Sequence, residues 1–268
     1  MKYLKISEFA HLTGIPRQNL IFYDKENILK PTFIDSKNNY RYYTLEQVDL
    51  ASAIIVLRES GFSLEQIKNW NIHRTPKTMQ NVFHQEAQEI NSKIKYLQQL
   101  QDVLMYRQKN IQEAKELPTL PYIKTNIFPK TPIILSKNIP DNDNYWLAFQ
   151  NFINYCKENH ITTSIPISSI ISKNNAETHN YQNISNFFYR PINPTLFLTN
   201  SFIPKEQYLQ VYHYANYEDT SEIYTFLYHY LHQHHLLIDS NIYQEYLIDE
   251  ASSSSPKNYI LKLTLKAK

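Results

Sequence analysis

Glycine and cysteine are scarce in this sequence, and both shortages exclude classes of protein. Only two glycines, Gly14 and Gly61, occur among 268 residues. Loops that wrap the phosphates of nucleotides need several residues that adopt positive φ angles without a Cβ clash. The single cysteine, Cys156, excludes a disulfide framework and any metal centre built from several thiolates. We therefore expect neither nucleotide-driven chemistry nor a thiolate-held metal.

Long apolar runs and a large excess of one charge are also missing. No apolar stretch approaches the roughly 18 to 20 residues that span a bilayer, and the start of the chain lacks the apolar core of a signal peptide. We therefore expect a cytoplasmic protein with no membrane partner. Residues 1–43 contain seven Lys or Arg against four Asp or Glu, a bias too small to identify a nucleic-acid binder by charge alone.

The N-terminal pattern predicts two short helices joined by a sharp turn within residues 2–24. Ser7 precedes the first apolar positions, Gly14 ends the first helix, and Pro16 lies where the second helix begins. This spacing is typical of a helix-turn-helix. Residues 33–43 predict a two-stranded hairpin, with an Asn pair at its tip that tolerates positive φ.

The next segments predict two capped helices and then one long helix. Thr44 with Gln47 and Ser63 with Gln66 form capping boxes for helices that end near Ser60 and Trp70. From about residue 76 to residue 116 there is no Pro or Gly after the start, and apolar residues recur every seven positions. Such a stripe predicts a homodimer through a coiled coil, whereas packing of the helix on its own chain is the alternative. The stripe is Phe83, Ile90, Leu97, Leu104 and Ile111, and its companion seam is Ala87, Ile94, Gln101 and Gln108.

After a Pro-rich linker, the composition changes to strands rich in aromatic and β-branched residues. Two helical stretches, 144–159 and 219–232, interrupt the strands. The order of the elements predicts an α+β domain made of two similar halves. The expected strands are 133–135, 187–189, 208–214, 242–247 and 259–265.

Several N-terminal motifs, in this order, resemble the MerR family of transcriptional regulators. The resemblance implies three parts: a winged helix-turn-helix domain at 1–72, a dimerisation coiled-coil helix at 75–117 and an effector-binding domain at 122–268. Ile21 stands where the family usually has Arg, which removes a phosphate contact, while Asn27 and Asn39 stand where it has Gly. The motifs are Ile6-Ser7-Glu8-Phe9-Ala10, Gly14-Ile15-Pro16, Tyr23-Asp24, Leu29-Lys30-Pro31, Tyr40-Arg41-Tyr42-Tyr43 and Gly61-Phe62-Ser63-Leu64.

The C-terminal part resembles the BmrR-like multidrug-binding subgroup, whose effector domain is GyrI-like. The segments 243–247 and 259–263 carry this likeness. It implies an acidic residue beneath aromatic side chains that accept lipophilic cations. The resemblance also implies an antiparallel coiled coil and binding to a promoter spacer that is deformed when the ligand binds, so that RNA polymerase is an indirect partner. No cofactor is implied.

Eight residues are candidates for DNA contact under this resemblance. The first turn of the second helix can reach base edges in the major groove, while residues near the hairpin can hold phosphates. In the alternative interpretation, Tyr23, Tyr40 and Tyr43 are core aromatics and Arg17 is a solvated surface charge. For Tyr40 and Tyr43 we expect the core position. The candidates are Arg17, Gln18, Asn19, Tyr23, Lys30, Asn38, Arg41 and Tyr42.

Glu245 is the principal candidate for ligand binding, because a carboxylate on a buried sheet face is costly unless it is paired. It either forms an internal salt bridge, for example with Lys262, or waits for a cation among aromatic rings. In the alternative interpretation without a ligand site, Glu245 points to water and the tyrosines are ordinary strand residues. The candidate cage residues are Tyr145, Tyr189, Tyr214 and Tyr259.

Neither a metal site nor a catalytic site is predicted. Several histidines cluster between His229 and His235, but no cysteine or clear carboxylate completes a ligand set. No nucleophile elbow or metalloprotease motif occurs. The alternative function is a GyrI-like protein that sequesters small molecules, or a hydrolase in which Glu245 acts as a general base, with little role in DNA binding.

Overall fold

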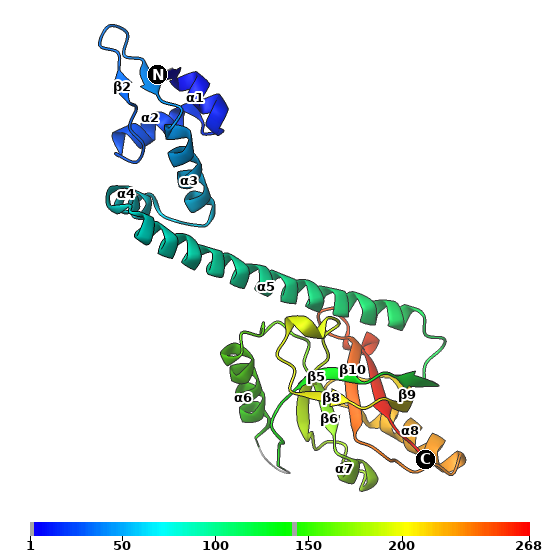
Figure 1. Cartoon of the computed structure of the whole chain (residues 1–268). Helices are drawn as coiled ribbons and strands as arrows, with labels where there is room; N and C mark the ends of the chain where they lie inside the picture. The colour runs from blue at the N-terminus through cyan, green and yellow to red at the C-terminus, as the bar shows by residue number, and fades with distance from the viewer. Residues whose placement is uncertain (1–2, 141–143) are drawn as a thin grey trace. The chain divides into compact units, whose positions relative to one another are not determined.

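The computed structural model describes residues 3–140 and 144–268. The chain divides into two compact units, Met1–Lys93 and Ile94–Lys268. The division falls inside the long helix α5 (Pro76–Lys115), which therefore contributes residues to both units (Figure 1). Within the described ranges, no helix has the length and apolarity that crossing a bilayer requires.

The N-terminal unit contains short helices and a small antiparallel sheet of strand order β1-β3-β2. The predicted helix-turn-helix is present, although residue 2 of the predicted segment lies outside the described residues. Gly14 ends the first helix with a φ of 74°, and its N–H donates to the Ala10 carbonyl at 2.9 Å. The elements are β1 (Leu4–Lys5), α1 (Ile6–Thr13), α2 (Arg17–Lys25), β2 (Phe33–Ile34), β3 (Arg41–Tyr43), α3 (Gln47–Glu59) and α4 (Leu64–His73).

Most local signals in the sequence are obeyed in this unit, but two are not. The predicted capping box of Thr44 with Gln47 does not form at the start of α3, because that helix begins at Gln47 with Glu46 as its N-cap and without a side-chain cap bond. Ser7 lies inside α1, whose N-cap is Lys5.

Asn27 and Asn39 adopt φ angles of 59° and 57°, the left-handed region in which Asn replaces Gly most readily. Ser63 accepts from the Gln66 N–H at 3.1 Å, and the Gln66 side chain accepts from the Ser63 N–H at 2.8 Å. This reciprocal pair is the predicted capping box at the start of α4.

The core of the unit lies where the helices meet β3. Tyr43 is fully buried and stacks on Phe9 with ring centroids 4.3 Å apart. The prediction that Tyr40 is also a core aromatic is wrong, since 47% of its surface is exposed. Tyr40 precedes β3, at the end of the hairpin where the chain has left the sheet. Its ring therefore has no layer of helices to pack against.

The part of α5 in the C-terminal unit has two faces of opposite character. One face is buried against its own unit and is mostly polar, comprising Gln99, Asp102, Val103, Tyr106 and Asn110. The other face carries the predicted heptad, and Leu97 and Leu104 are 61% and 68% exposed. Phe83 and Ile90, earlier in the same stripe, are exposed as well. The helix therefore packs on its own chain through one face, while its apolar stripe stays uncovered in a single chain.

The C-terminal unit is an α+β domain around an antiparallel sheet, which has eight strands among the described residues. All the predicted strands and helices form near their predicted bounds, whereas β4, β6, β8 and α7 lie outside the predicted elements. The strands are β4 (Tyr122–Phe128), β5 (Thr131–Leu135), β6 (Ser168–Ile171), β7 (Asn186–Tyr189), β8 (Ser201–Ile203), β9 (Glu206–Tyr214), β10 (Ile242–Ile248) and β11 (Ile260–Leu265). The helices are α6 (Tyr145–Glu158), α7 (Lys173–Glu177) and α8 (Ser221–Gln233), with 3-10 turns at Pro194–Leu196 and Pro256–Asn258.

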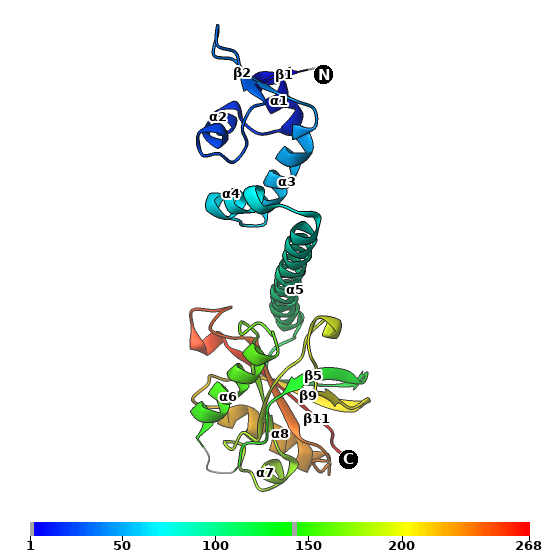
Figure 2. The same cartoon turned by 60° about the vertical axis from the view of Figure 1, so that its left-hand side comes forward.

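The strand order confirms the prediction of two similar halves. The sheet runs β4-β9-β11-β10-β6-β7-β5-β8. The first half has the chain order β5-α6-β6-α7-β7 and the second has β9-α8-β10-β11, so that β10 and β6 meet at the centre of the sheet. Each half thus contributes three strands in mirrored order and one long helix, α6 or α8, both labelled in Figure 2. The short helix α7 belongs to the first half alone, and β4 and β8 extend the two edges of the sheet.

Alternating residues of β10 and β11 face opposite sides of this sheet. Leu261 and Leu263 point into an apolar core with Leu227 of α8. The residues between them in register, Lys262 and its cross-strand partner Glu245, point to the side that α5 covers. One side of the sheet is therefore held by apolar contacts and the other by charged and polar ones.

The Tyr43 side chain generates the first prediction, because its buried hydroxyl has no hydrogen-bond partner within the part of the chain that the structure describes. Tyr43→Phe removes an unsatisfied polar group and keeps the stack on Phe9, so the free energy of unfolding of the N-terminal unit should stay unchanged or rise by up to about 1 kcal/mol. Phe9→Ala, which removes the stacked ring, should cost about 3–5 kcal/mol. Urea denaturation of the full chain measures the free energy of unfolding of both variants. A decrease of more than about 1 kcal/mol in Tyr43→Phe would show that the Tyr43 hydroxyl has a hydrogen-bond partner after all.

Candidate functional site

The start of α2 presents the predicted base-contacting residues to solvent. Arg17, Gln18 and Asn19 are exposed in its first turn, and Lys30 is exposed beyond its end. None of these four side chains makes a hydrogen bond or ion pair within residues 3–140 and 144–268. They are therefore available to an external partner.

The remaining DNA-contact candidates make contacts inside the unit. The Arg41 Nε donates to Asp24 Oδ2 at 2.8 Å. Asn38 donates to Asp35 and accepts from the Tyr40 N–H, so its amide closes the hairpin turn. Those side chains have a structural role whatever else they contact.

Two predicted aromatic contacts are also partly used within the unit. Tyr23 is 9% exposed and belongs to the core, as the alternative interpretation of this residue has it. Tyr42 stacks on Phe33 with ring centroids 4.8 Å apart. Ile21, which stands at the usual Arg position, packs against the same core as Tyr23. Contact of Tyr23 and Tyr42 with DNA stays a prediction.

Glu245 lies at the centre of a buried charge network in the C-terminal unit, with 2% of its surface exposed. The Arg190 guanidinium donates from Nε to Oε1 and from Nη2 to Oε2, both at 3.1 Å. The Tyr106 hydroxyl donates to Oε1 at 3.0 Å, and Lys262 Nζ lies 3.6 Å from Oε2. The internal salt bridge predicted as one alternative is therefore what the structure contains, and Glu245 does not point to water.

Sheet register explains how this network forms. Residues directly opposite one another on neighbouring strands have adjacent side chains. Tyr122, Tyr212, Lys262 and Glu245 stand in one such row across β4, β9, β11 and β10. Glu113 of α5 lies over the row, accepting from the Tyr212 hydroxyl at 2.6 Å and from Lys262 Nζ at 3.2 Å. The buried Lys262 thus has two carboxylate partners.

The pKa values follow from this competition between burial and charge. Burial raises the pKa of Glu245, but attraction to Arg190 and Lys262 outweighs it and lowers the pKa to about 2. Glu113 behaves in the same way, with burial opposed by Lys262 and the net pKa lowered. Burial and the Glu245 charge raise the pKa of Tyr106. Both carboxylates are therefore ionised, and the Tyr106 phenol is neutral, at physiological pH.

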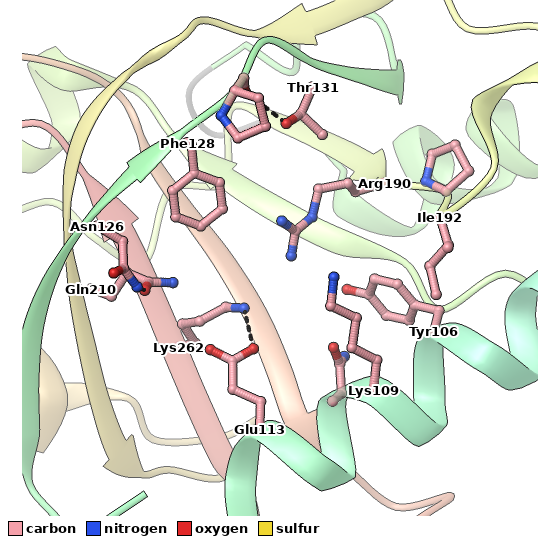
Figure 3. Close-up of a pocket in the computed structure, with 13 residues that line it drawn as sticks. Tyr106, Lys109, Glu113, Asn126, Phe128, Thr131, Arg190, Ile192, Gln210 and Lys262 are labelled. Carbon is pink, nitrogen blue, oxygen red and sulfur yellow. Dashed lines mark hydrogen bonds and ion pairs between the residues drawn. The ribbon is translucent and has the colours of Figure 1, made fainter. Parts of the chain in front are cut away.

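A cavity of about 320 Å³ opens beside this network, and we call it the central cavity (Figure 3). The head groups of Lys109, Arg190 and Lys262 point toward the same space in Figure 3. Phe128 forms part of the wall, and its ring centroid lies 5.8 Å from the Arg190 guanidinium carbon. The remaining lining residues are Tyr106, Asn110, Glu113, Asn126, Pro129, Thr131, Pro191, Ile192 and Gln210.

The structure does not assemble the predicted aromatic cage around Glu245. None of Tyr145, Tyr189, Tyr214 and Tyr259 lines the central cavity. Tyr145 donates to the Gln182 carbonyl, Tyr189 is fully buried and donates to Asp102, and Tyr214 is 49% exposed. Tyr259 is buried beside Tyr217, with ring centroids 5.6 Å apart. Tyr145 lies on α6, away from the cavity, and side chains on the strands alternate between the two faces of the sheet, so these rings do not converge on Glu245.

Sequence reasoning missed the residues that replace the cage. Arg190 directly follows the predicted strand at 187–189, and a charge at the end of an apolar strand was its only signal. Tyr106, Lys109 and Glu113 recur every three or four residues on the face of α5 opposite the heptad. That spacing marks a second helix face with its own partner.

Asp102 fixes the segment that carries Arg190. Its Oδ2 accepts from the Tyr189 hydroxyl at 2.9 Å and from the Ile192 N–H at 3.1 Å. Its Oδ1 accepts from the Asn193 N–H at 2.5 Å. Because Asp102 belongs to α5, these hydrogen bonds attach the segment that follows Arg190 to the helix.

The other candidates of the sequence play no part in the central cavity. Cys156 is buried in an apolar core, and burial raises the pKa of its thiol to about 11. No group of three or more His, Cys, Asp or Glu within the described residues could hold a metal ion.

Comparison with known proteins accounts for the N-terminal unit. Residues 4–70 match the model of the MerR HTH family of regulatory proteins. Residues 4–70 are therefore a MerR-type helix-turn-helix domain. Over its full length the chain is similar to the Multidrug-efflux transporter 2 regulator of Bacillus subtilis, with 26% identity over 271 residues, covering 100% of this chain and 97% of the relative.

Two further matches are a second curated relative and a solved structure. The Multidrug-efflux transporter 1 regulator of Bacillus subtilis is 29% identical over 118 residues, which cover 44% of this chain and 42% of the relative. A cryo-EM structure of the EcmrR–DNA complex in EcmrR-RPo matches with 17% identity and a TM-score of 0.42, covering 99% of each chain.

The Glu245 network generates a prediction about pH. A pKa of about 2, against an ordinary value of 4.5, means that ionised Glu245 stabilises the folded unit by about 3 kcal/mol at neutral pH. Glu245→Gln should therefore lower the free energy of unfolding by about that amount at pH 7. The difference from the wild type should persist down to pH 4.5 and shrink as the pH falls toward 2, where Glu245 itself becomes protonated.

Hydrogen exchange of the β10 and β11 amides in the full chain measures this difference. Glu206→Gln is the control, because Glu206 pairs with Lys266 at the surface and should contribute less than about 1 kcal/mol. A difference for Glu245→Gln that is equal at pH 2 and pH 7 would assign the effect to packing rather than to charge.

Proposed function

We propose that the chain is a MerR-family regulator that responds to a small lipophilic molecule bound in the central cavity and thereby alters promoter DNA. The cavity is the observation that carries the proposal, since it combines apolar walls with a few convergent polar groups, as small-molecule sites do. The names of the relatives, regulators of multidrug-efflux transporters, support a response to small molecules. They also support a regulator rather than an enzyme.

Helix α5 is the proposed transmitter. It supplies Tyr106, Lys109 and Glu113 to the cavity and continues without a break into residues 76–93 of the DNA-binding unit. A ligand that shifts the Lys262 head group would disturb its hydrogen bond to Glu113 of α5. A ligand that shifts the backbone after Arg190 would disturb the hydrogen bond from the Ile192 N–H to Asp102 of the same helix. Packed polar networks of this kind switch between discrete arrangements rather than deforming smoothly.

The exposed stripe of α5 is the proposed dimer interface. Leu97 and Leu104 are large apolar side chains that a single chain leaves exposed to water, which is typical of an interaction surface. They also repeat with the seven-residue period of a coiled coil. Two chains joined in this way as an antiparallel pair would present two DNA-binding units. A dimer can then hold both halves of a pseudo-palindrome and deform the spacer between promoter elements, which is how RNA polymerase would be affected.

The first turn of α2 is proposed to read the DNA. Arg17→Ala should weaken binding to the promoter fragment upstream of the gene by about 10-fold or more, because a specific base contact contributes about 1–3 kcal/mol. Fluorescence anisotropy of the full chain at fixed salt measures the affinity. Lys68→Ala on α4 removes an equal charge outside the proposed surface and should change binding little. An equal loss of DNA affinity in the two variants would contradict a base contact by Arg17, because it would show that only the overall positive charge matters.

The dimer interface has its own test. Leu97→Glu places a charge in the exposed stripe and should convert a dimer into a monomer at micromolar concentration, as sedimentation velocity would show. Ser92→Glu introduces the same charge at an exposed position outside the heptad stripe, and it should leave the dimer intact. A wild-type chain that sediments as a monomer would contradict the interface.

A further inference from the structure

The central cavity carries more positive than negative charge. Lys109, Arg190 and Lys262 line it, against Glu113 alone among the lining carboxylates. Glu245 adds one negative charge behind the wall, so three positive groups face two negative ones. This balance is opposite to that of a site built for a cation.

Both carboxylates are already occupied by internal partners. Glu245 accepts hydrogen bonds from Arg190 and Tyr106 and pairs with Lys262. Each of its two carboxylate oxygens therefore already has a positively charged partner. Glu113 accepts from Tyr212 and Lys262, and Lys124 lies 3.7 Å from it. A cationic ligand would have to displace Arg190 from Glu245, leaving a buried guanidinium without its counter-charge.

Two positive groups, in contrast, keep donors for a ligand. Arg190 uses Nε and Nη2 for Glu245, while its Nη1 makes no hydrogen bond within residues 3–140 and 144–268. Lys109 is exposed on α5 and forms no salt bridge over the same residues. Figure 3 shows both head groups directed into the cavity. A guanidinium and an ammonium that converge in this way match the two oxygens of a carboxylate.

The walls select the rest of the ligand. Phe128 and Tyr106 present aromatic rings, and Ile192 with two prolines completes the apolar lining. The volume of about 320 Å³ lies at the lower end of cavities that hold small molecules. It suits one or two fused rings rather than an extended drug.

We propose that the central cavity binds a small aromatic carboxylate, with Arg190 and Lys109 holding the carboxylate and Phe128 packing on the ring. This assignment rests on the proposed ligand response and replaces a lipophilic cation by an organic anion as the ligand. Lys109 determines the specificity, because it is the one lining cation that α5 holds outside the buried network.

Three probes that share one ring test the assignment: 2-naphthoate, 2-naphthamide and 2-naphthylmethylammonium. Isothermal titration of the full chain should give the tightest binding for the carboxylate, by about 10-fold or more over the amide, since hydrogen bonds to charged groups are about twice as strong as neutral ones. The ammonium should bind weakest. Added salt should appreciably weaken the binding of the carboxylate probe alone, because it screens the attraction between the carboxylate and the cavity cations.

Variants of Lys109 assign the binding to this cavity. Lys109→Gln should weaken the binding of 2-naphthoate by about 10-fold and leave the binding of 2-naphthamide unchanged. Lys109→Glu should reverse the preference, so that the ammonium probe binds more tightly than the carboxylate. Lys115→Gln, which removes the same charge from the last turn of α5 outside the cavity, should not change the binding of any probe. Both positions are exposed in the fold, so these variants should fold normally.

Three results would overturn the assignment: a preference of the wild type for the ammonium probe, equal binding of all three probes, or no binding of any of them. Equal effects of Lys109→Gln and Lys115→Gln would also overturn it, because they would show general attraction by the surface. Failure of the proposed function is separate. It would appear as ring-matched probes that bind the cavity while transcription from the bound promoter stays unchanged.

Discussion

The burial of one carboxylate, Glu245, is the constraint on which the C-terminal unit depends. An ionised group removed from water is tolerated only with partners on every side. Sheet register supplies Lys262, the end of β7 supplies Arg190, and α5 supplies Tyr106. Because Lys262 is buried as well, it requires a second acceptor, and Glu113 of α5 provides it. The helix is therefore attached to the sheet by charges.

This mode of attachment explains the composition of α5. A helix that packed on its own domain through leucines would have used its apolar stripe there. Here the inner face is polar and charged, and the heptad stripe on the opposite face remains uncovered. One helix can thus contribute cavity residues on one side and offer a dimer surface on the other. The proposed transmission requires that a change in the charge network on one face alters the position of the other.

Local structure could be predicted from the sequence because its causes are local. Gly14, Asn27 and the Ser63 capping box act through backbone angles and hydrogen bonds within a few residues. Alternation and periodicity located most strands of the C-terminal unit and α5, and the mirrored halves followed from the order of the elements. Glu245 was also recognised as a residue that needs a partner.

The partners of Glu245 could not be identified in this way. Tyr106 and Arg190 are 139 and 55 residues away along the chain. The predicted aromatic cage failed for the same reason, since rings such as Tyr145 and Tyr214 are separated by the sheet topology. Tyr40 was placed in the core because its motif neighbour Tyr43 is there, whereas the strand begins only after Tyr40.

The central claim is that occupation of the cavity changes the protein–DNA complex through α5. The most direct measurement is the end-to-end energy transfer of a doubly labelled promoter fragment bound to the full chain, before and after saturation with the ring-matched probe that binds most tightly. The account predicts a change in transfer efficiency for the wild type and none for a cavity variant that no longer binds the probe. A saturated cavity with unchanged DNA geometry would contradict it.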